Sequence, residues 1–131
     1  MLRIVAYRTG AARLAQIRWR IHEEGPAAWL PRDDEDLLLA RAWLGWCEMW
    51  RAHDWLAHAV EEARADEMAE LARHYDYRLV RDDLDTIMAL IEGLLVAICH
   101  PRRPLGRDRA RGLLERAIER FLADGNEANA A

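Results

Sequence analysis

Three tryptophans are spaced so that their rings would share one face of a helix. Trp43, Trp46 and Trp50 stand at positions i, i+3 and i+7, and the 131-residue chain holds six tryptophans in all. Large rigid rings bury much apolar area and attract cations to their faces, so this stripe suits a pocket for a small apolar or cationic molecule. The alternative is that the rings fill the core between helices. The pocket interpretation assigns ligand contacts to Trp19, Trp43, Trp46, Trp50, His74 and Met88.

Histidine and carboxylate side chains gather between residues 53 and 74. The Glu-x-x-His spacing of di-iron helical bundles is absent, because Arg73 stands three residues after Glu70. Glu70 and His74 are four residues apart and would share a helical face, as an ion pair, as a polar group inside a pocket or on a solvated surface. We expect no metal and no cofactor. A small helical metal-binding or enzymatic protein, built on His58, His74 and the carboxylates between them, is the alternative.

Two missing residue types exclude whole classes of enzyme. The chain contains neither serine nor lysine, so all 19 basic residues are arginine. It therefore has no serine nucleophile, no Schiff-base lysine and no lysine of a Walker-type phosphate loop. Nothing in the pattern resembles a catalytic triad, and we expect a protein that is not an enzyme.

The charge balance argues against a main role in binding nucleic acid. The formal net charge is −4, whereas binding a phosphate backbone requires a concentrated basic face. One basic cluster, between Arg102 and Arg111, lacks interleaved aromatic residues, and a solvated loop is its simpler interpretation. We expect no direct contact with nucleic acid.

Length and hydropathy favour one cytoplasmic domain. A chain of this size supports one hydrophobic core, so we expect a single domain over residues 1–131, with 1–10 and 125–131 poorly ordered. The N-terminal residues are too few and too polar for a signal peptide, and no apolar run is long enough to cross a bilayer. Cys47 and Cys99 stand far apart in apolar stretches, which is typical of reduced core cysteines. No membrane contact is expected.

Glycines and prolines divide the chain into helices. Ala, Leu, Arg, Glu and Met dominate the stretches between them and β-branched residues are scarce, which predicts an all-α bundle of about five helices. The expected helices cover about residues 11–24, 33–50, 54–79, 82–98 and 106–123, with residues 1–10 frayed or strand-like. The acids at 33–36 would cap the second helix, which is apolar nearly all round and is expected at the centre of the bundle. A wide apolar stripe marks the fourth helix: Leu84, Ile87, Met88, Ile91, Leu94, Leu95 and Ile98.

The last two expected helices resemble a known family. The segment from Asp83 to Ile98, the Pro/Arg loop, and the segment from Arg109 to Leu122 are similar to the closing helix pair of the tetracycline-repressor (TetR) family of transcriptional regulators. Glu92-Gly93-Leu94 looks like the acid-Gly-Leu step of its penultimate helix. Ala42-Trp43-Leu44-Gly45-Trp46 is similar to the aromatic-rich middle helix of its choline-responsive branch. The resemblance covers about residues 35–123.

The resemblance implies an effector-binding and dimerisation domain. In that family the last two helices of two subunits form a four-helix bundle, and the expected interface here is Ile87, Ile91, Leu94, Leu95, Leu114, Ile118 and Phe121. About 30 residues precede the matching region and contain no recognisable helix-turn-helix, so the DNA-binding head is missing. We expect a homodimer that senses a small-molecule effector in transcriptional control. The alternatives are a headless chain that sequesters a full-length TetR-family regulator and a purely structural interaction module.

Overall fold

The fold is all-α, as the composition predicts. The computed structural model describes residues 1–130, with side chains described as far as Gly125, and this part of the chain contains no strand. Its elements are α1 (Leu2–Glu24), the 3₁₀ helix η1 (Gly25–Trp29), α2 (Asp34–Trp50), α3 (Asp54–His74), α4 (Arg81–Ile98) and α5 (Arg107–Ala130).

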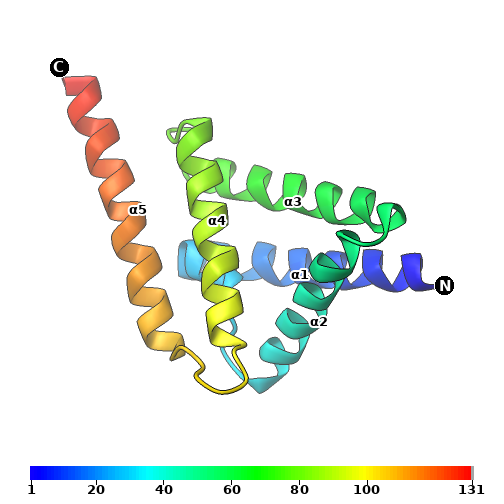
Figure 1. Ribbon diagram of the computed structural model, residues 1–131. Coiled ribbons are helices and arrows are strands. Elements are labelled where there is room, and N and C mark those ends of the chain that lie inside the picture. The colour runs from blue at the N-terminus through cyan, green and yellow to red at the C-terminus, as the bar shows by residue number, and fades with distance from the viewer. Residues whose placement is uncertain (131) are drawn as a thin grey trace.

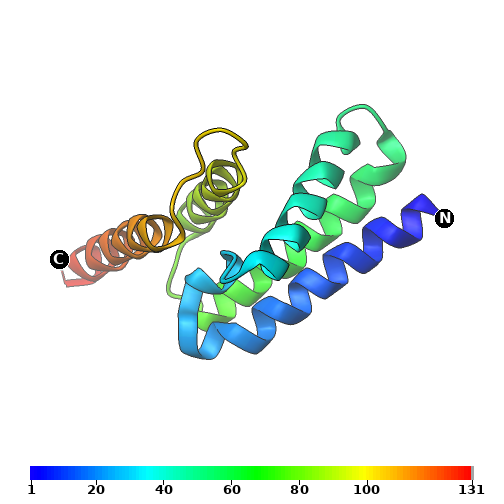
Figure 2. The same ribbon diagram turned by 90° about the horizontal axis from the view of Figure 1, so that it is seen from below.

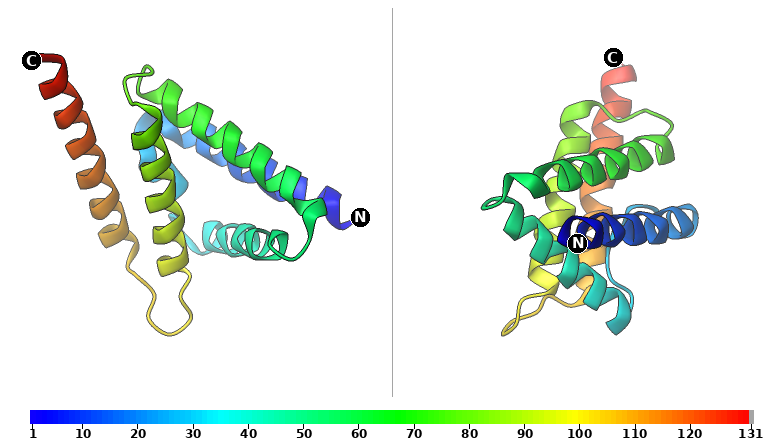
Figure 3. Two further views of the ribbon diagram at one scale, coloured as in Figure 1. Left: turned by 45° about the horizontal axis from the view of Figure 1, so that its top comes forward. Right: turned by 90° about the vertical axis from the view of Figure 1, so that its right-hand side faces the viewer.

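The helices form two groups. α1 and α3 lie side by side and run in the same direction, and α2 packs against both (Figures 1 and 2). α4 and α5 form a hairpin that stands across the ends of α1 and α3 (Figure 3). The hairpin is tied to the first group by contacts from α4 to α3 and from α5 to η1. The cavity described below lies where α2, α3 and α4 meet.

The first helix begins earlier than the sequence predicts. It starts at Leu2 rather than near residue 11. Gly10 lies inside it, where a Cβ atom would come within 3.3 Å of Trp43 Cζ3, so this glycine lets α1 approach the tryptophan ring closely. This glycine thus serves close packing between α1 and α2.

The second helix lies on the surface, which corrects its expected central position. Asp33 caps it by accepting a hydrogen bond from Asp36 N at 2.8 Å, as predicted. Its only fully buried residues are Asp36, Ala40 and Trp43, while Leu38 is 65% exposed. Packing against α1 and α3 buries one face, and the outward apolar residues remain in solvent.

The remaining boundaries agree with the sequence in part. α3 ends at His74 rather than near 79, because Asp76 and Tyr77 adopt left-handed backbone conformations with φ of 52° and 58°. α4 begins at Arg81, close to the expected start at 82, without a side-chain cap. All seven residues of its predicted stripe are buried. α5 continues past the expected stop at Asp124-Gly125 to Ala130.

The predicted interface residues lie in the core of the single chain. Ile87, Ile91, Leu95 and Leu114 are at most 1% exposed, Leu94 and Ile118 are also buried, and Phe121 is half-buried against them. Six of these seven side chains are therefore covered by the chain's own helices, and Phe121 alone among them keeps surface for a contact with a second subunit. Dimerisation itself stays a prediction, and it would have to use the outward faces of α4 and α5. No helix in the described residues has the length and apolarity needed to cross a membrane.

Candidate ligand cavity between α2, α3 and α4

A cavity of about 420 Å³ opens between α2, α3 and the C-terminal half of α4. Drug-sized ligands occupy cavities of this order, and the wall combines apolar surface with a few polar groups, as such sites do. The lining residues are Trp43, Leu44, Cys47, Glu48, Trp50, Arg51, Arg64, Glu92, Leu95, Val96, Cys99, His100 and Pro101.

Two of the predicted tryptophans form part of this wall, and arginines of the protein already sit beside both rings. Trp43 is buried and Trp50 is half-buried. The guanidinium carbon of Arg13 lies 5.7 Å from the Trp43 ring centroid, and that of Arg64 lies 6.0 Å from the Trp50 centroid. The chain itself thus supplies cations to the aromatic faces that the sequence offers to a cationic ligand.

Arg64 is the central polar group of the wall. Its Nε lies 2.9 Å from Oε1 of Glu92, which joins α3 to α4. The N–H of this Nε does not point at that oxygen, so a buried donor stays without an acceptor. An unsatisfied buried donor costs about 1–3 kcal/mol, which favours any molecule that brings an acceptor to it.

A buried ion pair lies beside the ring of Trp43. Arg13 Nη1 lies 3.3 Å from Glu67 Oε1, and both side chains are less than 10% exposed. Burial raises the pKa of Glu67, and the positive charge of Arg13 opposes that shift. The sequence interpretation left the acids of this helix on a solvated face, and for Glu67 and Glu70 the structure shows burial instead.

Two cysteine side chains line the same cavity. Cys47 comes from α2 and Cys99 from the residue that follows α4, and both are free and half-buried. Burial raises the pKa of the Cys47 thiol to about 11 and also raises that of Cys99. Because the thiolate is the reactive form, both groups act as neutral, weakly polar wall atoms at neutral pH.

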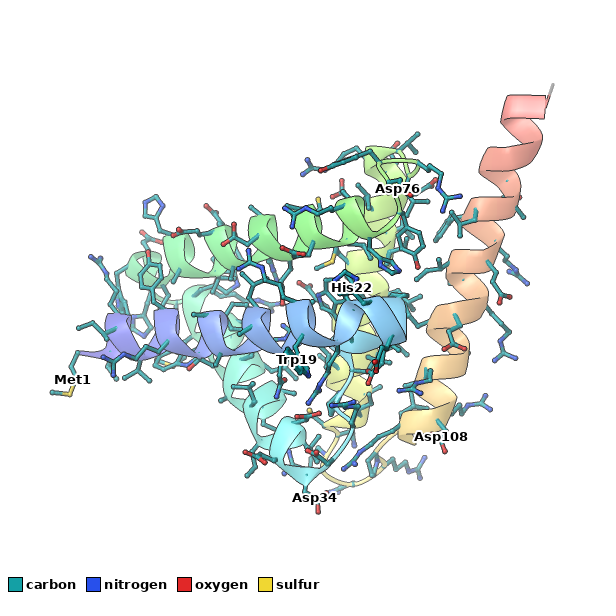
Figure 4. The ribbon with its side chains drawn as sticks, turned by 180° about the vertical axis from the view of Figure 1, so that it is seen from behind. Met1, Trp19, His22, Asp34, Asp76 and Asp108 are labelled. Carbon is teal, nitrogen blue, oxygen red and sulfur yellow. The ribbon has the colours of Figure 1, made fainter. Side chains whose placement is uncertain are left out.

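Four of the six predicted ligand residues do not reach this cavity. Trp19 is 85% exposed on α1 and projects into solvent (Figure 4). Met88 is buried in the core formed by α4. Trp46 is half-buried but is not part of the cavity wall, since a residue three positions from Trp43 is turned sideways on α2. Only Trp43 and Trp50, seven residues apart, face the same space.

His74 lies in a separate recess at the ends of α1 and α3. This recess is lined by Arg18, Ile21, His22, Glu70, Arg73, His74 and Asp76. Glu70 accepts hydrogen bonds from Arg18 Nε at 2.8 Å and Arg73 Nη1 at 3.0 Å, so its partners are arginines rather than His74. Burial and the nearby His22 lower the pKa of His74. Within the described residues, no three His, Cys, Asp or Glu side chains are placed to hold a metal ion.

The arginine cluster between 102 and 111 is partly structural. Arg107 donates hydrogen bonds to the carbonyl of Arg32 at 2.8 Å and to Asp34 at 2.9 Å, which ties the start of α5 to the start of α2. Arg111 lies 3.9 Å from Glu24. Two members of the cluster thus hold the helix hairpin to the rest of the chain.

Sequence reasoning missed most of the polar wall. Glu92 enters the sequence analysis only through the family resemblance. No sequence pattern predicts a site role for Arg64, because its partners Trp50 and Glu92 come from α2 and α4, far away in the chain. A helical period of 3.6 identifies which residues share a face, but it does not show which faces of three helices converge.

Comparison with known proteins gives no match: no protein-family model, no curated protein and no solved structure is significantly similar to this chain.

Proposed function

We propose that this chain is a regulatory domain of the TetR type that binds a small, largely apolar molecule between α2, α3 and α4 and acts in transcriptional control. The observation that carries the proposal is the cavity of about 420 Å³ walled by Trp43, Trp50, Leu95 and Val96. The resemblance of the last two helices to the closing pair of that family supports the regulatory role.

The wall favours an apolar ligand over a cationic one. A cation would have to compete with Arg13 and Arg64 for the electron-rich faces of Trp43 and Trp50. An apolar body needs no such displacement, because it gains by removing the exposed parts of Trp50 and Val96 from water.

The position of α4 supplies a route from the ligand to assembly. Glu92, Leu95 and Val96 line the cavity, while Ala89 and Gly93 lie exposed on the same helix. In the proposed function α4 also contributes to a twofold interface, so a ligand that shifts α4 changes how two subunits meet. The partner is a second copy of the chain.

A ligand titration with a cavity-filling variant tests the proposal. The probe is 1-decanol, and the readout is the intrinsic tryptophan fluorescence in a Trp19→Phe background that removes the most exposed indole. We expect saturable quenching or a spectral shift in this background. Cys47→Phe should abolish the response by filling the cavity from α2, and Cys99→Phe should do so from the α4 side.

The matched control is Ala42→Phe, which adds the same ring to an exposed position of α2 away from the cavity. It should bind the probe like the parent. Equal responses from Cys47→Phe, Cys99→Phe and Ala42→Phe would place binding elsewhere and overturn the proposal. Circular dichroism melts show which variants are folded at the titration temperature.

A further inference from the structure

The unsatisfied donor in the cavity wall identifies the chemistry of the ligand more closely. Resting on the proposed function, we infer that the ligand of this cavity is an apolar molecule with one anionic group, a carboxylate or its equivalent, which accepts a hydrogen bond from Arg64 Nε. The ligand class is thus an amphipathic organic acid.

The hydrogen-bond partners of Arg64 favour an anionic ligand. Arg64 Nε is buried, and Glu92, although 2.9 Å away, is not aligned to accept its proton. The side chains of both residues are between one third and one half exposed, but the Nε atom itself is covered, so a headgroup reaches it by displacing the Glu92 carboxylate. An acceptor placed there gains a charge-assisted hydrogen bond, which is stronger than a bond between neutral groups.

Charges of both signs surround the opening of the cavity. Two carboxylates, Glu48 and Glu92, and two arginines, Arg51 and Arg64, line the cavity. A cationic headgroup would pair with Glu92 and bring no acceptor to the buried Nε of Arg64, although the Arg64 side chain, at 37% exposure, can turn to water as Glu92 can. An anionic headgroup takes the place of Glu92 on Arg64, and Glu92 at 40% exposure can turn to water.

Burial also changes along the wall of the cavity. Trp43 and Leu95 are buried at the inner side of the cavity, while Arg64 and Glu92 are partly exposed. This gradient matches a molecule with an apolar end and one charged end. The rings of Trp43 and Trp50 would contact the apolar body.

A headgroup series on one hydrocarbon chain tests the inference. Decanoate, 1-decanol and decyltrimethylammonium share the apolar body and differ in charge, and calorimetry measures their affinities for the whole chain. We expect decanoate to bind at least about tenfold more tightly than decyltrimethylammonium, because only decanoate gains a charged hydrogen bond.

Three variants locate that preference. Arg64→Met should weaken decanoate about tenfold and leave 1-decanol unchanged within about twofold. Arg64→Lys keeps the positive charge but lacks the Nε donor, so its affinity for decanoate should lie between those of the parent and of Arg64→Met. Glu92→Gln removes the competing carboxylate and should strengthen the binding of decanoate. Because Glu92 is partly exposed, this substitution should not disturb the buried core.

The outcomes separate this inference from the function on which it rests. Equal affinities for the three probes, with loss in Cys47→Phe, would overturn the anionic ligand and leave the apolar cavity standing. Tightest binding of decyltrimethylammonium, abolished by Glu92→Gln, would reverse the charge assignment. Absence of binding by all three would overturn the cavity's function as well.

Discussion

Asp36 is the polar residue on which the junction of α1 and α2 depends. Its carboxylate accepts hydrogen bonds from Gln16 at 2.9 Å, from Arg20 at 2.6 and 3.0 Å, and from the backbone N–H of Arg32 at 2.9 Å. Burial alone would raise the pKa of Asp36, but the hydrogen bonds and charges of Arg20 and Arg32 outweigh it and hold the pKa below its ordinary value. The sequence suggests no more than a capping role for this acid.

We therefore expect Asp36→Asn to lower the free energy of unfolding by about 3 kcal/mol, because it leaves the guanidinium of Arg20 buried without its counter-charge. Asp34→Asn is the matched control, since the Asp34 side chain is fully exposed and only meets Arg107. Urea denaturation measures the free energy of unfolding of both variants.

The pH dependence of stability follows from the same carboxylate. Because the folded-state pKa of Asp36 is lowered, its contribution to the free energy of unfolding is complete above a pH of about 4 and is lost as the pH falls below that value. A parent and an Asp36→Asn variant of equal stability at neutral pH would contradict this role.

The pair Arg13–Glu67 predicts a different pattern of stability. Arg13→Met leaves the buried carboxylate of Glu67 without its partner and should lower the free energy of unfolding by about 3 kcal/mol at pH 7. The double variant Arg13→Met with Glu67→Leu removes both charges, and its free energy of unfolding should lie within about 1 kcal/mol of the parent value. The folded-state pKa of Glu67 is raised, so its ionisation costs stability as the pH rises through that pKa. Arg13→Met should therefore regain stability on acidification toward pH 5. Denaturation of the three variants at both pH values is the test, and a double variant as unstable as the single one would exclude a buried pair.

At the scale of the elements, two helical glycines have opposite roles. Gly10 in α1 faces the Trp43 ring, and Gly45 in α2 has no atom within 4 Å of the position that a Cβ would take. Glycine costs a helix interior about 1 kcal/mol relative to alanine.

Gly45→Ala should therefore raise the free energy of unfolding by about 0.5–1 kcal/mol, and Gly10→Ala should gain less, because its Cβ would press on Trp43 at 3.3 Å. Thermal melts of the two variants measure the difference. A larger gain at Gly10 than at Gly45 would contradict the close approach of α1 to Trp43.

The elements show where sequence patterns suffice and where they fail. The stripe on α4 is predictable residue by residue, because one wide apolar face meets one core and the 3.6-residue period describes it fully. The central position expected for α2 is wrong because its apolar residues are more numerous than the neighbours available to cover them, and Leu38 stays exposed. The early start of α1 is missed because no side chain caps the helix at Met1, so nothing in the sequence marks where it begins.

The candidate site is harder to predict than the helices that form it. Trp43 and Trp50 share a face and meet in the cavity, but Arg64 and Glu92 reach it from two other helices. Trp19 belongs to the exposed side of α1, and no pattern within one helix distinguishes an outward tryptophan from an inward one.

At the scale of the whole molecule, the proposed function predicts a dimer. The untagged protein should have about twice the chain mass of 15.2 kDa in solution by light scattering. Since most of the predicted interface residues are buried in the protomer, we expect the contact to include the outward face of α4, where Ala89 and Gly93 are exposed. Gly93→Arg should then yield monomers, because a buried unpaired charge is costly.

Ala65→Arg is the control for that experiment, because it adds the same side chain to an exposed position of α3. It should leave the dimer intact. A parent protein that stays monomeric throughout a dilution series would remove dimerisation from the account, and a dimer that tolerates Gly93→Arg would place the interface on another face.

The most direct test of the central claim is to follow the six indole N–H signals by two-dimensional NMR while 1-decanol is added. Assignment by single Trp→Phe variants separates the rings. The account predicts that Trp43 and Trp50, which line the cavity, shift together and saturably, while Trp19 and Trp29 keep their positions. Shifts confined to the exposed Trp19, or no shift at any ring, would contradict a ligand site between α2, α3 and α4.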